Sequence, residues 1–385
     1  MAYGEELRFR YRNPTRVVFG HGSLSRIGAE MESLGGTRAL VVTDQGLAQT
    51  DLPGRVTAAL GDRCVGTFAQ VAPDSGLDIV ARGVEMARDV HADLVVSVGG
   101  GSSMDTAKAL SLVLTRGGRL ADYFGQRIEG VLMPHIALPT TSGTGSETTR
   151  IAVIKDEAQA VKRTILSDSL FPSVAILDPQ MTVGLSPLLT ASTGMDAMTH
   201  AVEGLVSTLR EPIADALNVH AIRMIVKHLP RCVEQGDDVV ARGQQMIAAT
   251  LAGMGFGNAM VGVVHAAAHV VGARYGVPHG VANGILLSHG MRYNLDACRD
   301  GYALVADAMG VAEAGTDTEA AATAAVEAMK AFVREIRHPE RLRDVGVPHD
   351  ALEDCAAATV EEGAIRTNPR PAAVEWVLSM LREAW

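Results

Sequence analysis

The first half of the chain is organised around residues 92–108, ADLVVSVGGGSSMDTAK. A short apolar run at 94–98 has the character of a buried strand, and three glycines, Gly99, Gly100 and Gly101, follow it directly. The pattern after the glycines is helical, so the stretch predicts a strand, a tight turn and a helix. Glycines let the backbone approach a ligand, and a helix N-terminus offers free N–H groups and a partial positive charge to an anion. This favours a pyrophosphate site over a purely structural turn, although the GxGxxG spacing of the common dinucleotide fingerprint is absent.

Similar strands and helices surround this stretch. Other apolar runs without alternation occur at 39–43, 136–138 and 174–177, and helical patterns such as 77–90 lie between them. Strands that are apolar on both faces and alternate with helices form a parallel sheet that is covered on both sides. We therefore expect an α/β domain whose ligands bind at the carboxyl ends of the strands.

Two polar features follow predicted strands and extend the nucleotide site. The loop PTTSGTGSE at 139–147 offers hydroxyl donors to ribose, phosphate or nicotinamide, and Asp44 ends an earlier strand. A carboxylate at that position accepts hydrogen bonds from ribose hydroxyls and repels a 2′-phosphate, so NAD(H) is favoured over NADP(H). Alternatively, these polar side chains have no ligand and only cap the N-terminus of a helix.

The N-terminal residues predict a pair of strands. Apolar and arginine residues alternate over 7–11, and Asn13-Pro14 separates this segment from a second strand at 16–19. The arginines favour a solvated strand face over an anion-binding patch. Strands at this end of the chain can pair with the sheet edge of a second copy, which favours a homodimer.

The pattern changes near residue 185, beyond which helical signals dominate. We therefore expect an α/β dinucleotide-binding domain at 1–185 and an all-helical metal-binding domain at 186–385. Within the second domain, helical spacing over 213–229 predicts a helix that ends at Pro230.

Composition narrows the class of protein. The 385 residues are 47% hydrophobic and 20% charged, as in globular enzymes, and the net charge of −10 argues against a nucleic-acid partner. The sequence has no apolar run of transmembrane length and no apolar signal-peptide core at its N-terminus, so we expect no membrane association. A reduced, cytoplasmic protein is expected because the cysteines lack CxxC spacing. The four cysteines are Cys64, Cys232, Cys298 and Cys355.

Five potential metal ligands occupy two short stretches of the helical half. Asp196 and His200 are four residues apart, as are His265 and His269, so each pair shares one face of a helix. His279 follows the second pair after a turn. Imidazoles with one carboxylate suit Fe(II) or zinc and not calcium. Four ligands suffice, and the spacing leaves open which of His265 and His269 lies outside the set.

Several motifs together resemble the iron-containing (group III) alcohol dehydrogenase family over nearly the whole chain. They are GGGSSMDTAK, PTTSGTGSE, FPSVAILDPQMT, GMDAMTHAVE and HAAAHVVGARYGVPHGVANGILL. The resemblance implies a dehydroquinate synthase-like fold, with an N-terminal dinucleotide-binding α/β domain, an all-helical C-terminal domain and the active site in the cleft. It also implies a metal-dependent, NAD(H)-linked alcohol dehydrogenase or aldehyde reductase that acts on a small, aliphatic alcohol or aldehyde.

The resemblance assigns roles to individual residues. It implies Asp196, His200, His265 and His279 as ligands of Fe(II), with zinc as the alternative, and His269 as a catalytic neighbour of nicotinamide and substrate. The cofactor-binding residues that it implies are Asp44, Gly100, Gly101, Ser102, Asp105, Thr140, Thr141, Thr144 and Lys162. The residues that it places towards the substrate, all apolar, are Ile151, Phe256, Val261 and Val264.

Other enzymes of the same fold are alternatives. They are glycerol dehydrogenase-like and maleylacetate reductase-like oxidoreductases, and NAD-using lyases of the dehydroquinate synthase type. The lyases bind a polyanionic substrate, whereas the sequence around the metal-ligand motifs is poor in lysine and arginine. Arg150 is the nearest candidate for a carboxylate clamp. A non-catalytic, metal-stabilised binding protein is a third class, which two phosphate-type loops disfavour.

Overall fold

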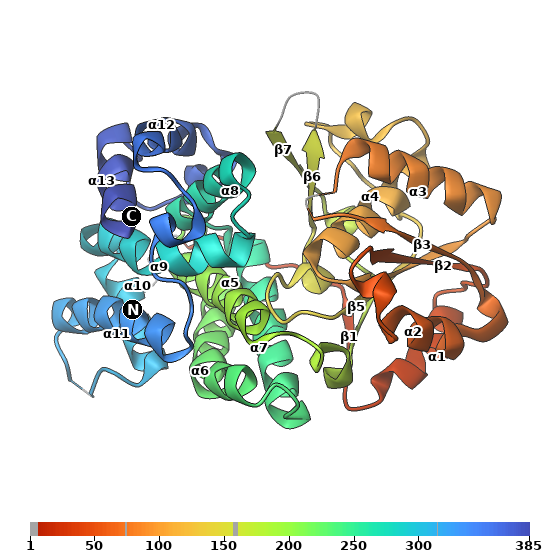
Figure 1. The fold of residues 1–385 in the computed structure, drawn as a ribbon, viewed down its shortest axis with the longest axis horizontal. Coiled ribbons are helices and arrows are strands. Elements are labelled where there is room, and N and C mark those ends of the chain that lie inside the picture. Colours follow the sequence, from red (N-terminus) through yellow and green to blue (C-terminus); the bar gives the residue numbers. More distant parts are fainter. Residues whose placement is uncertain (1–6, 74, 157–160, 314) are drawn as a thin grey trace. The chain divides into compact units, whose positions relative to one another are not determined.

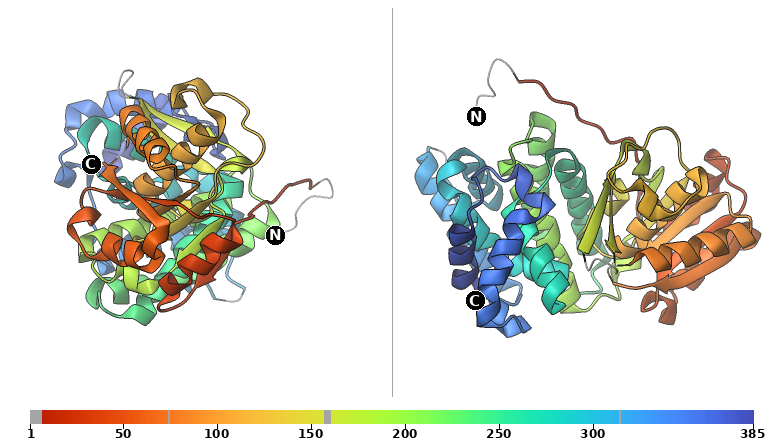
Figure 2. Two further views of the ribbon diagram at one scale, coloured as in Figure 1. Left: turned by 90° about the vertical axis from the view of Figure 1, so that its right-hand side faces the viewer. Right: turned by 90° about the horizontal axis from the view of Figure 1, so that it is seen from above.

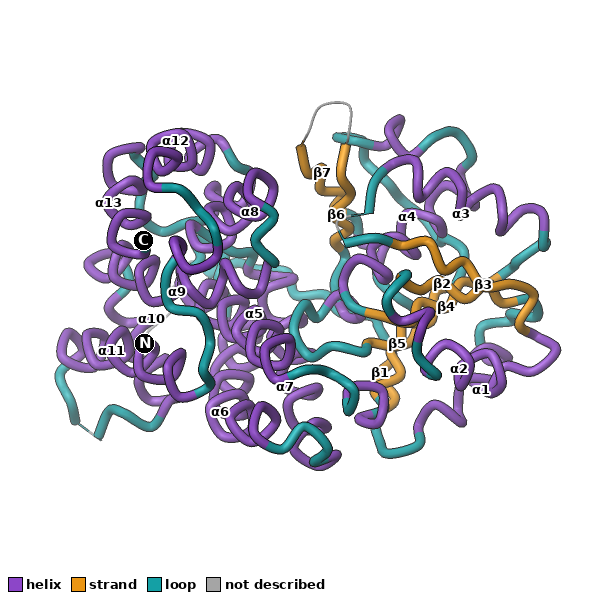
Figure 3. Tube along the Cα trace, viewed as in Figure 1, coloured by secondary structure: helices purple, strands orange, loops and turns teal. Residues whose placement is uncertain are grey.

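The computed structural model describes residues 7–73, 75–156, 161–313 and 315–385, and in it the chain divides into two compact units. One unit comprises residues 13–184, and the other comprises residues 185–385 together with 7–12. The described strands all belong to the first unit, and the second unit is helical (Figures 1 and 3).

The first unit is built on a six-stranded parallel sheet with the order β1-β8-β5-β4-β2-β3. This sheet confirms the predicted fold class, and the strands expected at 39–43, 94–98, 136–138 and 174–177 are all present. A separate antiparallel hairpin of β6 and β7 packs against α4. The strands are β1 (Arg16–Phe19), β2 (Ala39–Asp44), β3 (Cys64–Val71), β4 (Leu94–Gly99), β5 (His135–Pro139), β6 (Ile151–Asp156), β7 (Val161–Leu166) and β8 (Val174–Leu177).

Helices cover both faces of this sheet (Figures 1 and 2). Leu40 and Val42 of β2 join the apolar core under α3 and α4, whereas Ala39 and Val41 join the core under α1 and α2. Successive side chains of a strand point to opposite faces, so a strand that is buried on both sides must be apolar at every position. The helices are α1 (Ile27–Ser33), α2 (Leu52–Leu60), α3 (Leu77–Asp89) and α4 (Gly101–Arg116).

The helical unit is assembled around α5, which is almost wholly buried and packs against α6, α7 and α9. Its core is rich in alanine and valine and poor in aromatic residues, which lets the helices approach closely. The helices are α5 (Pro187–Val206), α6 (Pro212–Glu234), α7 (Val239–Ala259), α8 (Val263–Tyr275), α9 (His279–Asn294), α10 (Arg299–Met309), α11 (Thr318–Glu335), α12 (Leu352–Glu361) and α13 (Val374–Ala384).

Two predictions of secondary structure are wrong. The segment 7–11 forms no strand: Leu7 and Phe9 are 41% and 47% exposed, and the backbone N–H of Arg12 donates instead to the side chain of Asn258 at 3.0 Å. Pro230 does not end its helix, because α6 continues to Glu234. Leu229 and Cys232 are fully buried on either side of it, so packing offsets the hydrogen bond that proline removes.

The bend between α7 and α8 separates two apolar helices. Their axes meet at 104°, and Met260 at the bend has a φ of 66°. Taken together the two helices have the length and apolar composition of a membrane span, whereas no single helix among the described residues does.

Candidate functional site

The loops after β4 and β5 meet at the carboxyl edge of the sheet, because these strands are parallel neighbours. A Cβ placed on Gly100 would lie 3.3 Å from Thr141 Oγ1, and one on Gly101 would lie 2.9 Å from Thr144 Cγ2. The glycine turn therefore touches the threonine loop directly, and only glycine fits at position 101 without a shift. Among the described residues no side chain caps α4 at its N-terminus, which leaves backbone N–H groups for an anion.

Asp44 stands at the end of β2, beside the same glycine turn. Its Oδ1 accepts the N–H of Leu47 at 2.8 Å, and its Oδ2 would lie 3.4 Å from a Cβ on Gly99. Gly99 has a φ of 154°, and Thr140 donates its N–H to the Gly99 carbonyl at 3.0 Å. The structure thus gathers Asp44, Gly100, Gly101, Thr140, Thr141 and Thr144 around one turn.

Asp105 makes contacts within the protein that the sequence did not reveal. Its Oδ1 accepts the Ser146 hydroxyl at 2.7 Å, and its Oδ2 accepts the N–H of Val153 at 2.9 Å. Lys108, one turn further along α4, donates to Ser146 Oγ and to the Ile151 carbonyl, both at 2.7 Å. Burial lowers the pKa of Lys108 to about 8 and raises the pKa of Asp105. The pair holds the loop 139–147 against α4, and a contact between Asp105 and a cofactor stays a prediction.

The other two predicted cofactor residues lie elsewhere in the same unit. Ser102 is in the first turn of α4, and Lys162 is in β7, opposite Lys155 of β6.

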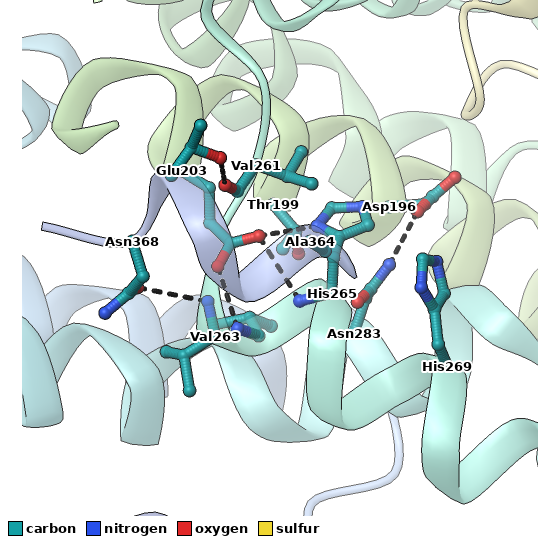
Figure 4. Close-up of polar contacts among 12 residues, drawn as sticks. Asp196, Thr199, Glu203, Val261, Val263, His265, His269, Asn283, Ala364 and Asn368 are labelled. Atoms are coloured by element: carbon teal, nitrogen blue, oxygen red, sulfur yellow. Dashed lines mark hydrogen bonds and ion pairs between the residues drawn. The ribbon is translucent and has the colours of Figure 1, made fainter. Parts of the chain in front are cut away.

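Three of the predicted metal ligands converge in the helical unit. Asp196 on α5, His265 on α8 and His279, the first residue of α9, each offer one ligand atom, and these atoms lie within 4.8 Å of one another. Asp196 Oδ1 is 3.4 Å from His279 Nε2 and 3.8 Å from His265 Nε2. Figure 4 shows Asp196 and His265 together with the polar residues around them.

This donor set fits a divalent cation. Two imidazole nitrogens and one carboxylate oxygen at these separations leave space for an ion about 2.0–2.2 Å from each. His265 Nε2 is buried and finds no hydrogen-bond partner among the described residues, which is costly unless a cation takes its lone pair. Burial, and then the neighbouring His200 and His269, lower the pKa of His265 well below its usual value, so the ring is neutral and able to bind a metal.

His200 and His269 lie on opposite flanks of this group. The His200 ring stacks between those of Phe256 and His265, at centroid distances of 3.9 and 4.5 Å. The His269 ring stacks on His279 at 5.2 Å, and its Nδ1 is 3.1 Å from Glu362 Oε1. Neither ring belongs to the group of three converging ligand atoms found among the described residues. The role of His200 as a fourth ligand and that of His269 as a catalytic neighbour therefore stay predictions.

A short turn and one glycine set the position of His279. α8 ends at Tyr275, the following Gly276 reverses the chain with a φ of 68°, and α9 begins at His279. A Cβ on Gly280 would lie 2.3 Å from the backbone oxygen of Ser192 in α5. Only glycine lets α9 approach α5 so closely. The point of contact, Ser192, lies one turn of α5 before Asp196.

Three further polar residues of this region were not predicted from the sequence. Glu203 accepts from His265, Asn283 donates its side-chain N–H to Asp196 Oδ1 at 2.8 Å, and Glu362 contacts His269. Helical spacing carries a signal for two of them, since Glu203 follows Asp196 by seven residues and Asn283 follows His279 by four. Glu362 carries no local signal, because its partner is 93 residues away.

Family models match nearly the whole chain. The model described as "Iron-containing alcohol dehydrogenase" matches residues 14–179, and "Fe-containing alcohol dehydrogenase family, C-terminal" matches residues 190–385.

Individual relatives agree with these matches. The NAD-dependent methanol dehydrogenase of Bacillus methanolicus is 36% identical, over 96% of this chain and 98% of its own. The 1,3-propanediol dehydrogenase of Klebsiella pneumoniae is 38% identical, over 98% of this chain and 99% of its own. A crystal structure of 1,3-propanediol oxidoreductase superposes with a TM-score of 0.95 at 37% identity, covering 98% of this chain and 100% of the other. The chain therefore belongs to the iron-containing alcohol dehydrogenase family, and the activity predicted from its motifs, that of an alcohol dehydrogenase acting on CH–OH groups, is confirmed.

Proposed function

We propose that the protein oxidises small aliphatic primary alcohols, and reduces the matching aldehydes, with NAD(H) and one Fe(II) ion, for which zinc is the alternative. Domain 1–185 binds the dinucleotide, and domain 186–385 holds the metal through Asp196, His200, His265 and His279. The observation that carries this proposal is the convergence of three ligand atoms within 4.8 Å, with the buried Nε2 of His265 left unpartnered.

In this proposal the metal-site residues activate the alcohol and the loops of the first domain bind the cofactor. A cation at this site supplies Lewis-acid polarisation of the alcohol oxygen, which lowers the pKa of the hydroxyl. The glycine turn and the threonine loop hold the pyrophosphate, and Asp44 accepts hydrogen bonds from the adenosine ribose. Because that carboxylate repels a 2′-phosphate, we propose NAD(H) over NADP(H).

His269 is proposed to take up the alcohol proton. Burial opposes ionisation of Glu362, but the interaction with His269 and the backbone N–H groups of Ala364 and Gly363 together outweigh it and lower the pKa of this carboxyl. The ionised Glu362 accepts from His269 Nδ1, which leaves the lone pair of the ring on Nε2. That nitrogen is the proton acceptor in oxidation and, once protonated, the donor in reduction.

An uncharged substrate is favoured by the surroundings. Phe256 and Val261, which line the substrate in the proposal, are apolar, and Phe256 lies against His200. Arg150 pairs with Asp168 at 2.8 Å, so it is committed within its own unit and is not a free clamp for a carboxylate. Methanol and 1,3-propanediol, the substrates named for two relatives, are the first compounds to try.

We propose further that the enzyme is a cytoplasmic homodimer. The four cysteines are all free, in keeping with a reducing compartment. β1 is an edge strand, and its Val17 and Phe19 are 37% and 45% exposed, so it offers a surface for a second copy. Light scattering at several concentrations tests this, and a monomer throughout would refute it.

The proposed reaction is tested by stripping and restoring the metal. Anaerobically prepared protein is assayed with methanol, ethanol, 1,3-propanediol and their aldehydes, using NADH and NADPH in parallel. Chelation is expected to abolish turnover, and Fe(II) or zinc to restore it. Turnover that survives complete chelation, or activity restricted to polyanionic substrates, would contradict the proposal.

A further inference from the structure

Glu203 is buried between α5 and the start of α8. Its Oε1 accepts the N–H of Val264 at 2.8 Å, and its Oε2 is 2.6 Å from His265 Nδ1 and 3.3 Å from the N–H of the same residue (Figure 4). The side chain is 4% exposed, so water contributes little to its solvation. A single carboxylate thus binds both the backbone and the ring of a proposed metal ligand.

The geometry of this contact determines which ring nitrogen of His265 carries the proton. Burial raises the pKa of Glu203 to about 7, whereas the backbone N–H groups of Val264 and His265, which donate to it, favour the ionised form. An ionised carboxylate only accepts, so the 2.6 Å contact with Oε2 requires the hydrogen on His265 Nδ1. In a neutral imidazole the other nitrogen then has the free lone pair. That nitrogen is Nε2, which lies 3.8 Å from Asp196 Oδ1 and has no hydrogen-bond partner in the part of the chain that the structure describes.

We propose that Glu203 is a positioning residue that fixes His265 as its Nδ1–H tautomer and so presents an unprotonated Nε2 to the metal. The inference rests on the metal site put forward above and adds to it a residue that touches neither metal nor substrate. Removal of such an outer carboxylate typically weakens metal binding about 10- to 100-fold.

A second residue separates this role from simple capping of α8. Asn368 Oδ1 accepts the N–H of Val263 at 3.1 Å, so it caps the same helix end without touching the His265 ring. Loss of this cap should destabilise the helix and leave the tautomer unchanged.

The Glu203→Gln substitution opposes the required tautomer at nearly constant volume. While its amide oxygen accepts from Val264, its NH₂ group faces His265 Nδ1 and favours a lone pair there. The proton then moves to Nε2, where it blocks the metal. Asn368→Ala is the matched control, because it removes a cap of α8 and keeps Glu203.

The experiment measures Co(II) affinity and histidine tautomers in the full-length, metal-stripped chain. Co(II) is titrated into wild type, Glu203→Gln and Asn368→Ala, with its visible absorption as the signal. In parallel, ¹⁵N spectra of histidine-labelled protein, assigned with His265→Asn, report the tautomer of His265. We expect Glu203→Gln to bind Co(II) about 10- to 100-fold more weakly and to shift His265 to the Nε2–H form. Asn368→Ala should unfold at a lower temperature with near-normal Co(II) affinity.

Two results would overturn the inference while leaving the metal site intact. One is Glu203→Gln binding Co(II) as tightly as wild type with His265 still in the Nδ1–H form. The other is an equal loss of affinity in Asn368→Ala, which would reduce Glu203 to a helix cap. Wild type that binds no Co(II) would instead refute the metal site itself, and this proposal with it.

Discussion

Substitution of Gly280 by alanine should separate α9 from α5 and disturb the metal site through its neighbour His279. The new Cβ would lie 2.3 Å from the Ser192 backbone oxygen and 2.8 Å from its carbonyl carbon. Backbone atoms cannot rotate away as a side chain does, so the start of α9 must move by roughly 1 Å. Overpacking of this kind costs about 1–3 kcal/mol of stability. A displacement of about 1 Å at a catalytic group lowers turnover roughly 100-fold.

Thermal unfolding, bound metal and kcat are measured for Gly280→Ala beside Gly54→Ala. Gly54 lies in α2, and a Cβ there meets nothing within 4 Å, so this control isolates the generic effect of replacing glycine in a helix. The control is expected to be neutral or more stable by about 0.4–1 kcal/mol. Gly280→Ala with wild-type stability, metal content and kcat would refute the close approach of α9 to α5.

Three further predictions concern single side chains. Asp44→Gly should raise activity with NADPH relative to NADH, since the carboxylate that repels a 2′-phosphate is gone; an unchanged ratio in paired initial-rate assays would count against the role of Asp44. His269→Ala should retain bound metal and lower kcat by about 10²–10⁴-fold, and metal loss on elemental analysis would make His269 a ligand. The pKa of Lys108 is about 8 in the folded chain and about 10.5 in the unfolded chain. Between these two pH values unfolding takes up a proton, so the contribution of Lys108 to the free energy of unfolding rises with pH. From pH 7 to 9.5 the free energy of unfolding should rise by about 2 kcal/mol from this residue, and Lys108→Met should lack that rise in urea unfolding. An identical pH slope in wild type and Lys108→Met would contradict the burial of this amine.

The sequence predicted those features that depend on local pattern. Uninterrupted apolar runs such as 39–43 indicated a doubly covered parallel sheet, and the pattern over 92–108 indicated a strand, a tight turn and a helix, which are β4 and α4. Residues one helical turn apart, Asp196 and His200, do lie on one buried helix, α5, whereas the role of His200 as a ligand stays a prediction.

Features that depend on distant partners were not predictable in this way. The contact of Glu203 with His265 joins residues 62 positions apart, and that of Glu362 with His269 spans 93. Helical spacing relates Glu203 to Asp196 on the same helix, but no local pattern specifies its partner His265, because such pairs arise when separate helices pack. The alternation over 7–11 misled for the same reason: a strand needs a partner strand to form a hydrogen-bonded ladder, and this segment has none among the described residues. The helix end predicted at Pro230 was wrong because burial of the neighbouring residues outweighs the tendency of proline to end a helix.

In the proposed reaction, His279 and its neighbours hold a metal without which the enzyme does not turn over. The most direct test is elemental analysis of anaerobically purified wild type, His279→Ala and the exposed-histidine control His220→Ala, with turnover measured on the same samples. We expect one divalent metal per chain in wild type and in the control, and loss of both metal and turnover in His279→Ala. Full metal content or full turnover in His279→Ala would contradict it.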